Sequence, residues 1–199
     1  MKFNRAWFRK EVAPILLALV LVTAARSSLA DHYYVPSGSM ENTLFAGDRV
    51  VVDKTAYGWR IPYTKIDLVD RARPQPGEVA VFDSPADGVL LIKRIVAVGG
   101  QLVSLRDGRL VVDGVALESG RAPASEQFGD RLVALNLADG GGLSIDRLVV
   151  PPGKLLAMGD HRGMSFDGRY FGLVDERELY GRAVAVYFRK GDGFVWKAL

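Results

Sequence analysis

The sequence predicts an all-β protein, a mainly antiparallel β core with a small inserted β-hairpin region, preceded by one N-terminal transmembrane helix. Three observations support this fold class. Beyond residue 31 the apolar residues occur in short β-branched runs bounded by Gly, Pro or Asp. The same region shows no helical periodicity of useful length, apart from a short stretch at 175–179. Near the N-terminus lies one long uncharged apolar segment.

The uncharged part of that segment runs from Val12 to Ala25, and with "RSSLA" (26–30) the stretch reaches 19 residues, which as a helix span about 28 Å, close to the hydrocarbon thickness of a bilayer. Five basic residues and one acidic residue precede position 31, and most of this charge lies before the apolar stretch. The N-terminus is therefore expected in the cytoplasm and residues 31–199 outside. A cleavable signal peptide is the alternative, because "SLA" before Asp31 matches a cleavage site. The domain prediction is an anchor over 1–30 and an exported β-rich domain over 31–199.

The predicted strands are short and follow one another along the exported part. "LVSLRDGRLVVDG" (102–114) predicts a hairpin that turns at Asp107-Gly108. We expect the inserted hairpin region at about 99–150, with "ADGGGLS" (138–144) as a surface loop. The other strands are expected at 48–54, 78–82, 89–98, 155–158 and 183–188.

Charge and composition exclude several classes of protein. Of 26 basic and 23 acidic residues, 21 and 22 remain in residues 31–199, so the exported part is nearly neutral and nucleic acid is not an expected partner. No cysteine is present, which rules out disulfides and thiolate sites. The two histidines, His32 and His161, are too few for a typical zinc site, and no metal or cofactor is expected.

The chemistry centres on "YYVPSGSMENTL" (33–44), where Ser37 and Ser39 flank a glycine. A serine hydroxyl is a weak nucleophile until a neighbouring base removes its proton. A Ser-His-Asp triad through His161 is one reading. A neutral lysine is the other, because burial lowers a lysine pKa by about 3–5 units. Of the eight lysines only Lys93 stands in a long apolar run, "VLLIKRIVAV". Strand alternation directs Lys93 and Arg94 to opposite faces, so that one can enter the apolar side while the other reaches solvent.

A third polar stretch, "MGDHRGMSFDGRYFG" (158–172), reads as a tight turn. Asp167 and Arg169 lie two residues apart, so on extended backbone they share a side and can pair or brace neighbouring loops. The Ser165 hydroxyl is a candidate for orienting a neutral lysine by a hydrogen bond.

Taken together and in this order, the stretches resemble type I signal peptidase, the bacterial leader peptidase family of Ser-Lys proteases. "VPSGSMENTL" resembles its nucleophile box, "LIKRIVAVGGQLV" its lysine box and "GDHRGMSFDGRYFG" its Gly-Asp box. The resemblance implies an all-β catalytic core. It also implies Ser39 as nucleophile, Lys93 as general base and Ser165 as the lysine-orienting residue. The oxyanion hole would come from Ser37 and the Ser39 N–H, with Asp160, Asp167 and Arg169 as supports of the site.

The resemblance further implies what the protein acts on and where. The expected substrates are exported preproteins cleaved after small-x-small sites such as Ala-x-Ala. The expected location is the outer, periplasmic face of the bacterial inner membrane, in contact with the bilayer and near the secretion translocon. Residues 56–63, "AYGWRIPY", are expected on the membrane side. Adjacency to the dyad suggests four apolar residues for the substrate pocket: Val35, Leu44, Leu91 and Ile92.

The chain departs from the family pattern at Asn42, where proline is common, and at His161, Gly163 and Met164 of the last box. These changes leave a general or a dedicated substrate range open, including a maturation peptidase of the conjugative-transfer type. The alternative from another class is a non-catalytic, membrane-tethered β module that binds exported proteins.

Overall fold

The computed structural model describes residues 7–19, 30–58, 72–120 and 124–199. Helical conformation runs from Trp7 to Leu19, with a π-helical stretch at Phe8–Val12. No helix within these described ranges is both long and apolar enough to cross a membrane. Residues 20–29 of the predicted anchor, and residues 59–63 of the predicted membrane-side segment, lie outside the described residues.

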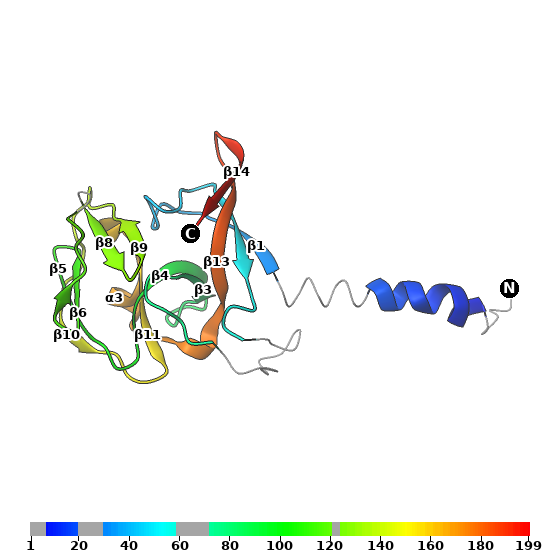
Figure 1. Ribbon diagram of the computed structural model, residues 1–199, viewed down its shortest axis with the longest axis horizontal. Coiled ribbons are helices and arrows are strands. Elements are labelled where there is room, and N and C mark those ends of the chain that lie inside the picture. The colour runs from blue at the N-terminus through cyan, green and yellow to red at the C-terminus, as the bar shows by residue number, and fades with distance from the viewer. Residues whose placement is uncertain (1–6, 20–29, 59–71, 121–123) are drawn as a thin grey trace.

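The rest of the described chain is mostly antiparallel β, which confirms the predicted all-β class (Figure 1). The largest sheet has eight strands in the order β1-β2-β13-β3-β4-β11-β12, and β14 also pairs with β13. Their bounds are β1 Ala30–Tyr34, β2 Arg49–Asp53, β3 Val79–Asp83, β4 Leu90–Val98, β11 Lys154–Met158, β12 Val174–Asp175, β13 Leu179–Arg189 and β14 Gly193–Ala198.

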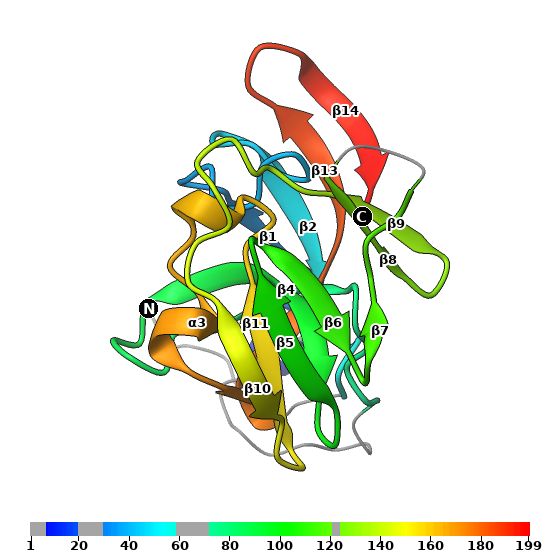
Figure 2. The ribbon, with the colours of Figure 1, turned by 90° about the vertical axis from the view of Figure 1, so that its left-hand side faces the viewer.

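Strands β4 and β11 are neighbours in this sheet, and the chain between them forms two smaller sheets (Figure 2). One has the order β10-β5-β6-β7, and the other pairs β8 with β9. The predicted hairpin at Asp107-Gly108 is confirmed, because β5 pairs with β6 across it. The bounds are β5 Leu102–Arg106, β6 Arg109–Val112, β7 Val115–Ala116, β8 Ser125–Phe128, β9 Arg131–Ala134 and β10 Ile145–Val149.

Short helical turns complete the fold: η2 (Arg162–Met164), α3 (Gly168–Phe171) and η3 (Glu176–Glu178). Helix α3 lies within the third polar stretch, where the sequence predicts only a turn. Its N-cap is Asp167, whose carboxylate accepts a hydrogen bond from the Arg169 N–H. An aspartate at this position satisfies an N–H that has no partner inside the helix.

Three apolar clusters hold the sheets together. The first packs the small sheets on β4 and β11, through residues such as Leu105, Leu110 and Met158. The second lies between β2, β3 and β13 and includes Met40 and Leu44 from the loop after β1. The third covers the other face of β3 and β4. Burial of this kind contributes about 25 cal/mol per Å² of apolar surface. The loop that carries Ser39 is thus fixed by side chains of the core.

Candidate active site

The candidate nucleophile lies in the loop between β1 and β2, which begins and ends in buried structure. Met40 and Leu44 are fully buried on either side of a tight turn, in which the Leu44 N–H donates to the Met40 carbonyl at 2.8 Å. At the far end Asp48 accepts from the Phe45 N–H and from the Arg189 guanidinium. These contacts hold Ser39 in one place, with only 8% of its surface exposed.

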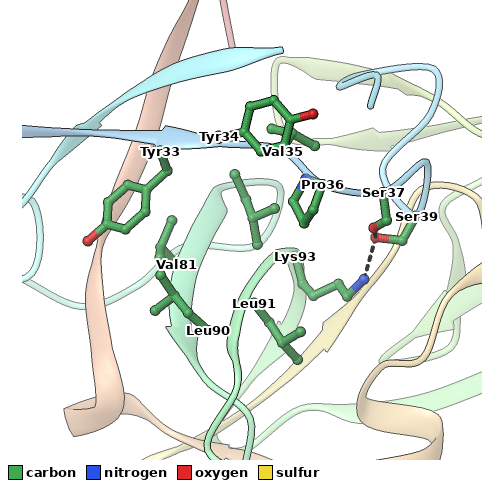
Figure 3. A pocket seen from close by; sticks show the side chains of 11 residues that line it. Tyr33, Tyr34, Val35, Pro36, Ser37, Ser39, Val81, Leu90, Leu91 and Lys93 are labelled. Carbon is green, nitrogen blue, oxygen red and sulfur yellow. Dashed lines mark hydrogen bonds between the residues drawn. The ribbon is translucent and has the colours of Figure 1, made fainter. Parts of the chain in front are cut away.

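Lys93 extends from β4 toward Ser39, and its Nζ donates a hydrogen bond to the Ser39 Oγ at 2.5 Å (Figure 3). The lysine is 3% exposed. Burial lowers its pKa to about 8, because the charged ammonium loses the water that would solvate it. The carboxylates of Asp167 and Asp160 oppose this shift, and the Arg169 guanidinium adds to it. At pH 7 about a tenth of the molecules therefore carry the neutral amine that a base requires.

The two carboxylates near Lys93 are each paired with an arginine. Asp160 accepts two hydrogen bonds from Arg94, from Nε at 2.8 Å and from an Nη at 2.7 Å. Lys93 and Arg94 are 3% and 4% exposed, so neither reaches solvent, and the expectation that one of them does is wrong. A guanidinium tolerates burial when a carboxylate binds it in this bidentate way. The pairing also limits how strongly Asp160 favours a charged Lys93.

Asp167 and Arg169 pair as the sequence predicts, through two hydrogen bonds of 2.8 Å. Burial by itself raises the pKa of the Asp167 carboxyl. The Arg169 guanidinium and the Gly159 N–H outweigh that effect and hold this pKa below its ordinary value. Arg169 also donates to the Gly141 and Arg162 carbonyls. The glycine-rich segment predicted as a plain surface loop is thus fastened to the site.

The Ser165 hydroxyl is buried and, among the residues that the structure describes, has no hydrogen-bond partner of good geometry, although it lies near enough to Asp167 to help lower the pKa of that carboxyl. Its place is fixed by Gly159, where a Cβ would collide with both the Ser165 hydroxyl and the Ser39 carbonyl oxygen. Residue 159 must therefore be glycine for these two serines to approach each other. An unpartnered buried hydroxyl is costly, which is typical of a group that gains its partner during function.

Ser37 lies on the open side of the nucleophile, and its Oγ is 3.4 Å from the Ser39 Oγ. Since Ser37 is exposed, its hydroxyl is free to turn toward a carbonyl oxygen bound beside Ser39.

A pocket of about 70 Å³ opens beside the dyad. Val35, Leu91 and Ile92, all predicted as pocket residues, line it. Leu44 does not. It is fully buried in the core under the loop, because the turn at residues 40–44 points its side chain inward. The pocket also includes residues that adjacency to the dyad did not suggest: Tyr33, Tyr34, Pro36, Val81 and Leu90.

Of these, Tyr33 and Tyr34 carried a signal in the sequence. They directly precede the nucleophile loop, whereas strand alternation places Leu90 on the face of β4 opposite to Lys93 and so did not suggest it. Thr43 is a further unpredicted contact. Its hydroxyl bonds Asp160 at 2.5 Å and accepts from Arg94 at 2.9 Å. No sequence pattern identifies it, since its partners come from β4 and from the turn after β11.

The comparisons with known proteins agree with these motifs. A family model described as signal peptidase, peptidase S26, matches residues 8–188. Signal peptidase I of Pseudomonas fluorescens is 31% identical over 205 residues, which cover 90% of this chain and 71% of that protein. Probable signal peptidase I-1 of Synechocystis sp. is 31% identical over 182 residues, 91% of this chain and 83% of that protein.

A crystal structure of a signal peptidase I from Enterococcus faecalis is 28% identical, covers 56% of this chain and 97% of that chain, and superimposes with a TM-score of 0.40. The family match, together with two relatives that are 31% identical over about nine tenths of the chain, confirms the resemblance that the ordered motifs predicted. The chain belongs to the signal peptidase family, peptidase S26, and is a signal peptidase.

Proposed function

We propose that this signal peptidase cleaves exported preproteins by acyl transfer through a dyad of Ser39 and Lys93. The observation that carries the proposal is the 2.5 Å hydrogen bond from the Lys93 Nζ to the Ser39 Oγ, between two buried side chains. A base must lie within hydrogen-bonding distance of the proton that it removes, and its pKa must suit the working pH. Lys93, with a pKa of about 8, meets both conditions.

In the first step, neutral Lys93 takes the Ser39 proton as the Oγ attacks the scissile carbonyl. Negative charge then grows on the carbonyl oxygen, where the Ser39 N–H and the Ser37 hydroxyl donate hydrogen bonds to it. One such donor contributes about 3–4 kcal/mol to the transition state. The Lys93 ammonium next protonates the leaving amine. The neutral Lys93 amine then activates a water, which releases the acyl group from Ser39. Ser165 turns its unpartnered hydroxyl to Lys93 when the ammonium forms.

The pocket beside the dyad supports a preference for small side chains at the cut. Its volume of about 70 Å³ is less than half that of a cavity of about 150 Å³ that holds one benzene ring. Alanine fits such a space and an aromatic side chain does not. We therefore infer cleavage after small-x-small sequences such as Ala-x-Ala.

The proposal includes a membrane-bound enzyme. We assign residues 1–30 as a cytoplasmic tip and a membrane anchor, and residues 31–199 as the catalytic domain on the outer face of the bacterial inner membrane. Six large apolar side chains of the described helix are exposed: Trp7, Phe8, Ile15, Leu16, Leu17 and Leu19. Exposed apolar surface of this kind calls for a lipid or protein partner. An anchor would keep the enzyme near the bilayer and the translocon, where preproteins emerge.

Cleavage of a panel of signal-peptide substrates by wild type, Ser39→Ala and Lys93→Met tests the mechanism. Both variants are expected to lose cleavage, with Lys93→Met nearly preserving side-chain volume so that lost chemistry is separated from lost packing. Full activity in either variant would overturn the dyad. Tight binding without any cleavage by the wild type would favour the non-catalytic module, and cleavage of one substrate alone would favour a dedicated maturation peptidase.

A further inference from the structure

The side chain of His161 lies between two carboxylates on the side of the nucleophile loop that faces β9 and the loop after it. Its Nε2 is 2.7 Å from the Asp139 carboxylate, and its Nδ1 is 3.5 Å from the Glu41 carboxylate. The residue is 5% exposed. The ion pairs found for Glu41 and Asp139 within the described residues are those with His161.

Both the main chain and the side chain of this cluster reach the nucleophile turn. The His161 N–H donates to the Ser39 carbonyl at 3.1 Å, and the Glu41 N–H donates to the Gly38 carbonyl at 3.0 Å. The Glu41 carboxylate lies so close to Gly38 that a Cβ there would collide with it. The Gly38–Ser39 peptide carries the N–H that we assign to the oxyanion hole. A change in the contacts of His161 therefore alters the position of the backbone next to that N–H.

The Asp139 end of the cluster is also closely packed. At Gly163 a Cβ would collide with the Asp139 carbonyl, so the departure from the family pattern at this position lets the Asp139 segment approach. Asn42, another departure, donates from its amide to the Leu135 carbonyl at 3.0 Å. The nucleophile loop is thus tied to residues 135–139 directly by Asn42 and, through His161, by Glu41.

The protonation state of the imidazole decides how many of these links hold. As an imidazolium, the ring carries a proton on both nitrogens: Nε2 donates to Asp139, and Nδ1 forms the 3.5 Å ion pair with Glu41. As a neutral ring that keeps its proton on Nε2, it bonds Asp139 alone, and Nδ1 accepts from the Asn136 amide 3.4 Å away. Glu41 then retains only the weak contact with the same amide, also at 3.4 Å.

The other charges that face the cluster are already compensated. Asp160 is paired with Arg94, and Arg162 is paired with Glu126 at 2.6 Å. An uncompensated Glu41 carboxylate would place a negative charge next to the site where the oxyanion develops. Like charges at such short range oppose the transition state.

We propose that His161 is a positioning residue for the nucleophile turn, and that its imidazolium holds and neutralises Glu41 beside the oxyanion site. This inference rests on the proposed function of Ser39. It concerns a residue at which the chain departs from the family pattern, and it assigns no chemical step to the imidazole.

The test compares kcat/KM of wild type and His161→Asn between about pH 5 and pH 8, the range in which histidines titrate. The titration of Lys93 affects both enzymes equally and cancels in their ratio. We expect wild type to be faster by about tenfold at the acidic end, through kcat more than KM, with the ratio falling toward one as the ring loses its proton. A ratio that stays constant over this range would overturn the proposal.

His32→Asn is the matched control, since His32 is exposed on β1 and we expect no pH-dependent change in the ratio. Glu41→Gln removes the negative charge that the imidazolium neutralises, so it should cost less than His161→Asn at acidic pH, and the two together should cost no more than His161→Asn alone. Fully additive losses would contradict a shared path through Glu41.

The melting temperature does not depend on catalysis, so it tests this proposal separately from the proposed function. In a Ser39→Ala background, His161→Asn should lower the melting temperature more at pH 5 than at pH 8, because only the imidazolium makes both ion pairs. Equal decreases at both pH values would overturn the role of the imidazolium. Retained cleavage by Ser39→Ala would instead refute the dyad and leave this comparison intact.

Discussion

Lys93 lowers the stability of the fold while it provides the base that the proposed activity requires. Its ordinary pKa of 10.5 falls to about 8 in the fold because the ammonium is desolvated. A shift of this size costs the folded state about 3 kcal/mol whenever the lysine is charged in both states. The sheet tolerates that cost at the position where a base is needed, opposite Ser39.

Lys93→Met should therefore stabilise the protein while abolishing cleavage. Below pH 8 we expect the free energy of unfolding to rise by about 2 kcal/mol, allowing for the lost hydrogen bond to Ser39. The gain should shrink as the pH rises from about 8 toward 10.5, because there the unfolded chain binds the proton and the folded wild type does not. Chemical denaturation at several pH values measures this. A less stable variant at pH 7 would contradict the desolvation argument.

The rate of cleavage should depend on the protonation state of Lys93. Since only neutral Lys93 can accept the Ser39 proton, kcat/KM is expected to rise about tenfold per pH unit on the acidic side and to level off near pH 8. Initial rates on a peptide substrate across this range test the expectation. A profile that stays flat from pH 6 to pH 9 would exclude Lys93 as the base.

Gly159 is a residue whose missing side chain matters. Gly159→Ala should lower kcat by about a hundredfold, because its Cβ would displace Ser165 or the Ser39 carbonyl. Gly120→Ala is the matched control, since a Cβ at residue 120 meets nothing within 4 Å. Similar rates for the two variants would show that the close approach of the serines is unimportant.

At the scale of elements, the site is assembled by strand order. The pairing of β4 with β11 brings Arg94 opposite Met158, just before the turn that carries Asp160. The loop between β1 and β2 supplies Ser39, and it contacts the same turn through the hydrogen bond from the His161 N–H to the Ser39 carbonyl. The inserted sheets add Glu126 from β8, which pairs with Arg162 under the same turn. Three segments far apart in the sequence thus meet through antiparallel pairing.

The Arg162–Glu126 pair predicts how firmly the inserted sheets support the catalytic turn. Both side chains are almost completely buried, and Glu126 also accepts from the Leu110 N–H. Glu126→Gln should lower the free energy of unfolding by about 3–5 kcal/mol, because it leaves a buried guanidinium uncompensated. Asp146→Asn, in an exposed pair with Arg106, should cost less than about 1 kcal/mol. Equal effects in denaturation would contradict the importance of burial.

At the scale of the whole molecule, the proposed anchor determines which substrates the enzyme meets. Tethering two reactants to one bilayer raises their effective concentration without changing the active site. Leu17→Arg should weaken membrane association, since arginine costs about 2.5–3.5 kcal/mol in the centre of a membrane helix. Cleavage of a membrane-inserted preprotein should then fall much more than cleavage of a soluble peptide. Leu17→Ala is the control, and equal losses on both substrates would contradict the anchor.

The sequence by itself determined the all-β class, the hairpin at Asp107-Gly108 and the family, because strand alternation, turn residues and ordered motifs are local properties of the chain. It also indicated Ser39 and Lys93, one by its motif and the other by its apolar surroundings. Only the tertiary structure decided that Arg94 is buried, that Leu44 belongs to the core, and that Thr43 and His161 contact the site. Those outcomes depend on which distant segments meet, and the pairing of strands far apart in the chain sets that, since no short pattern records it.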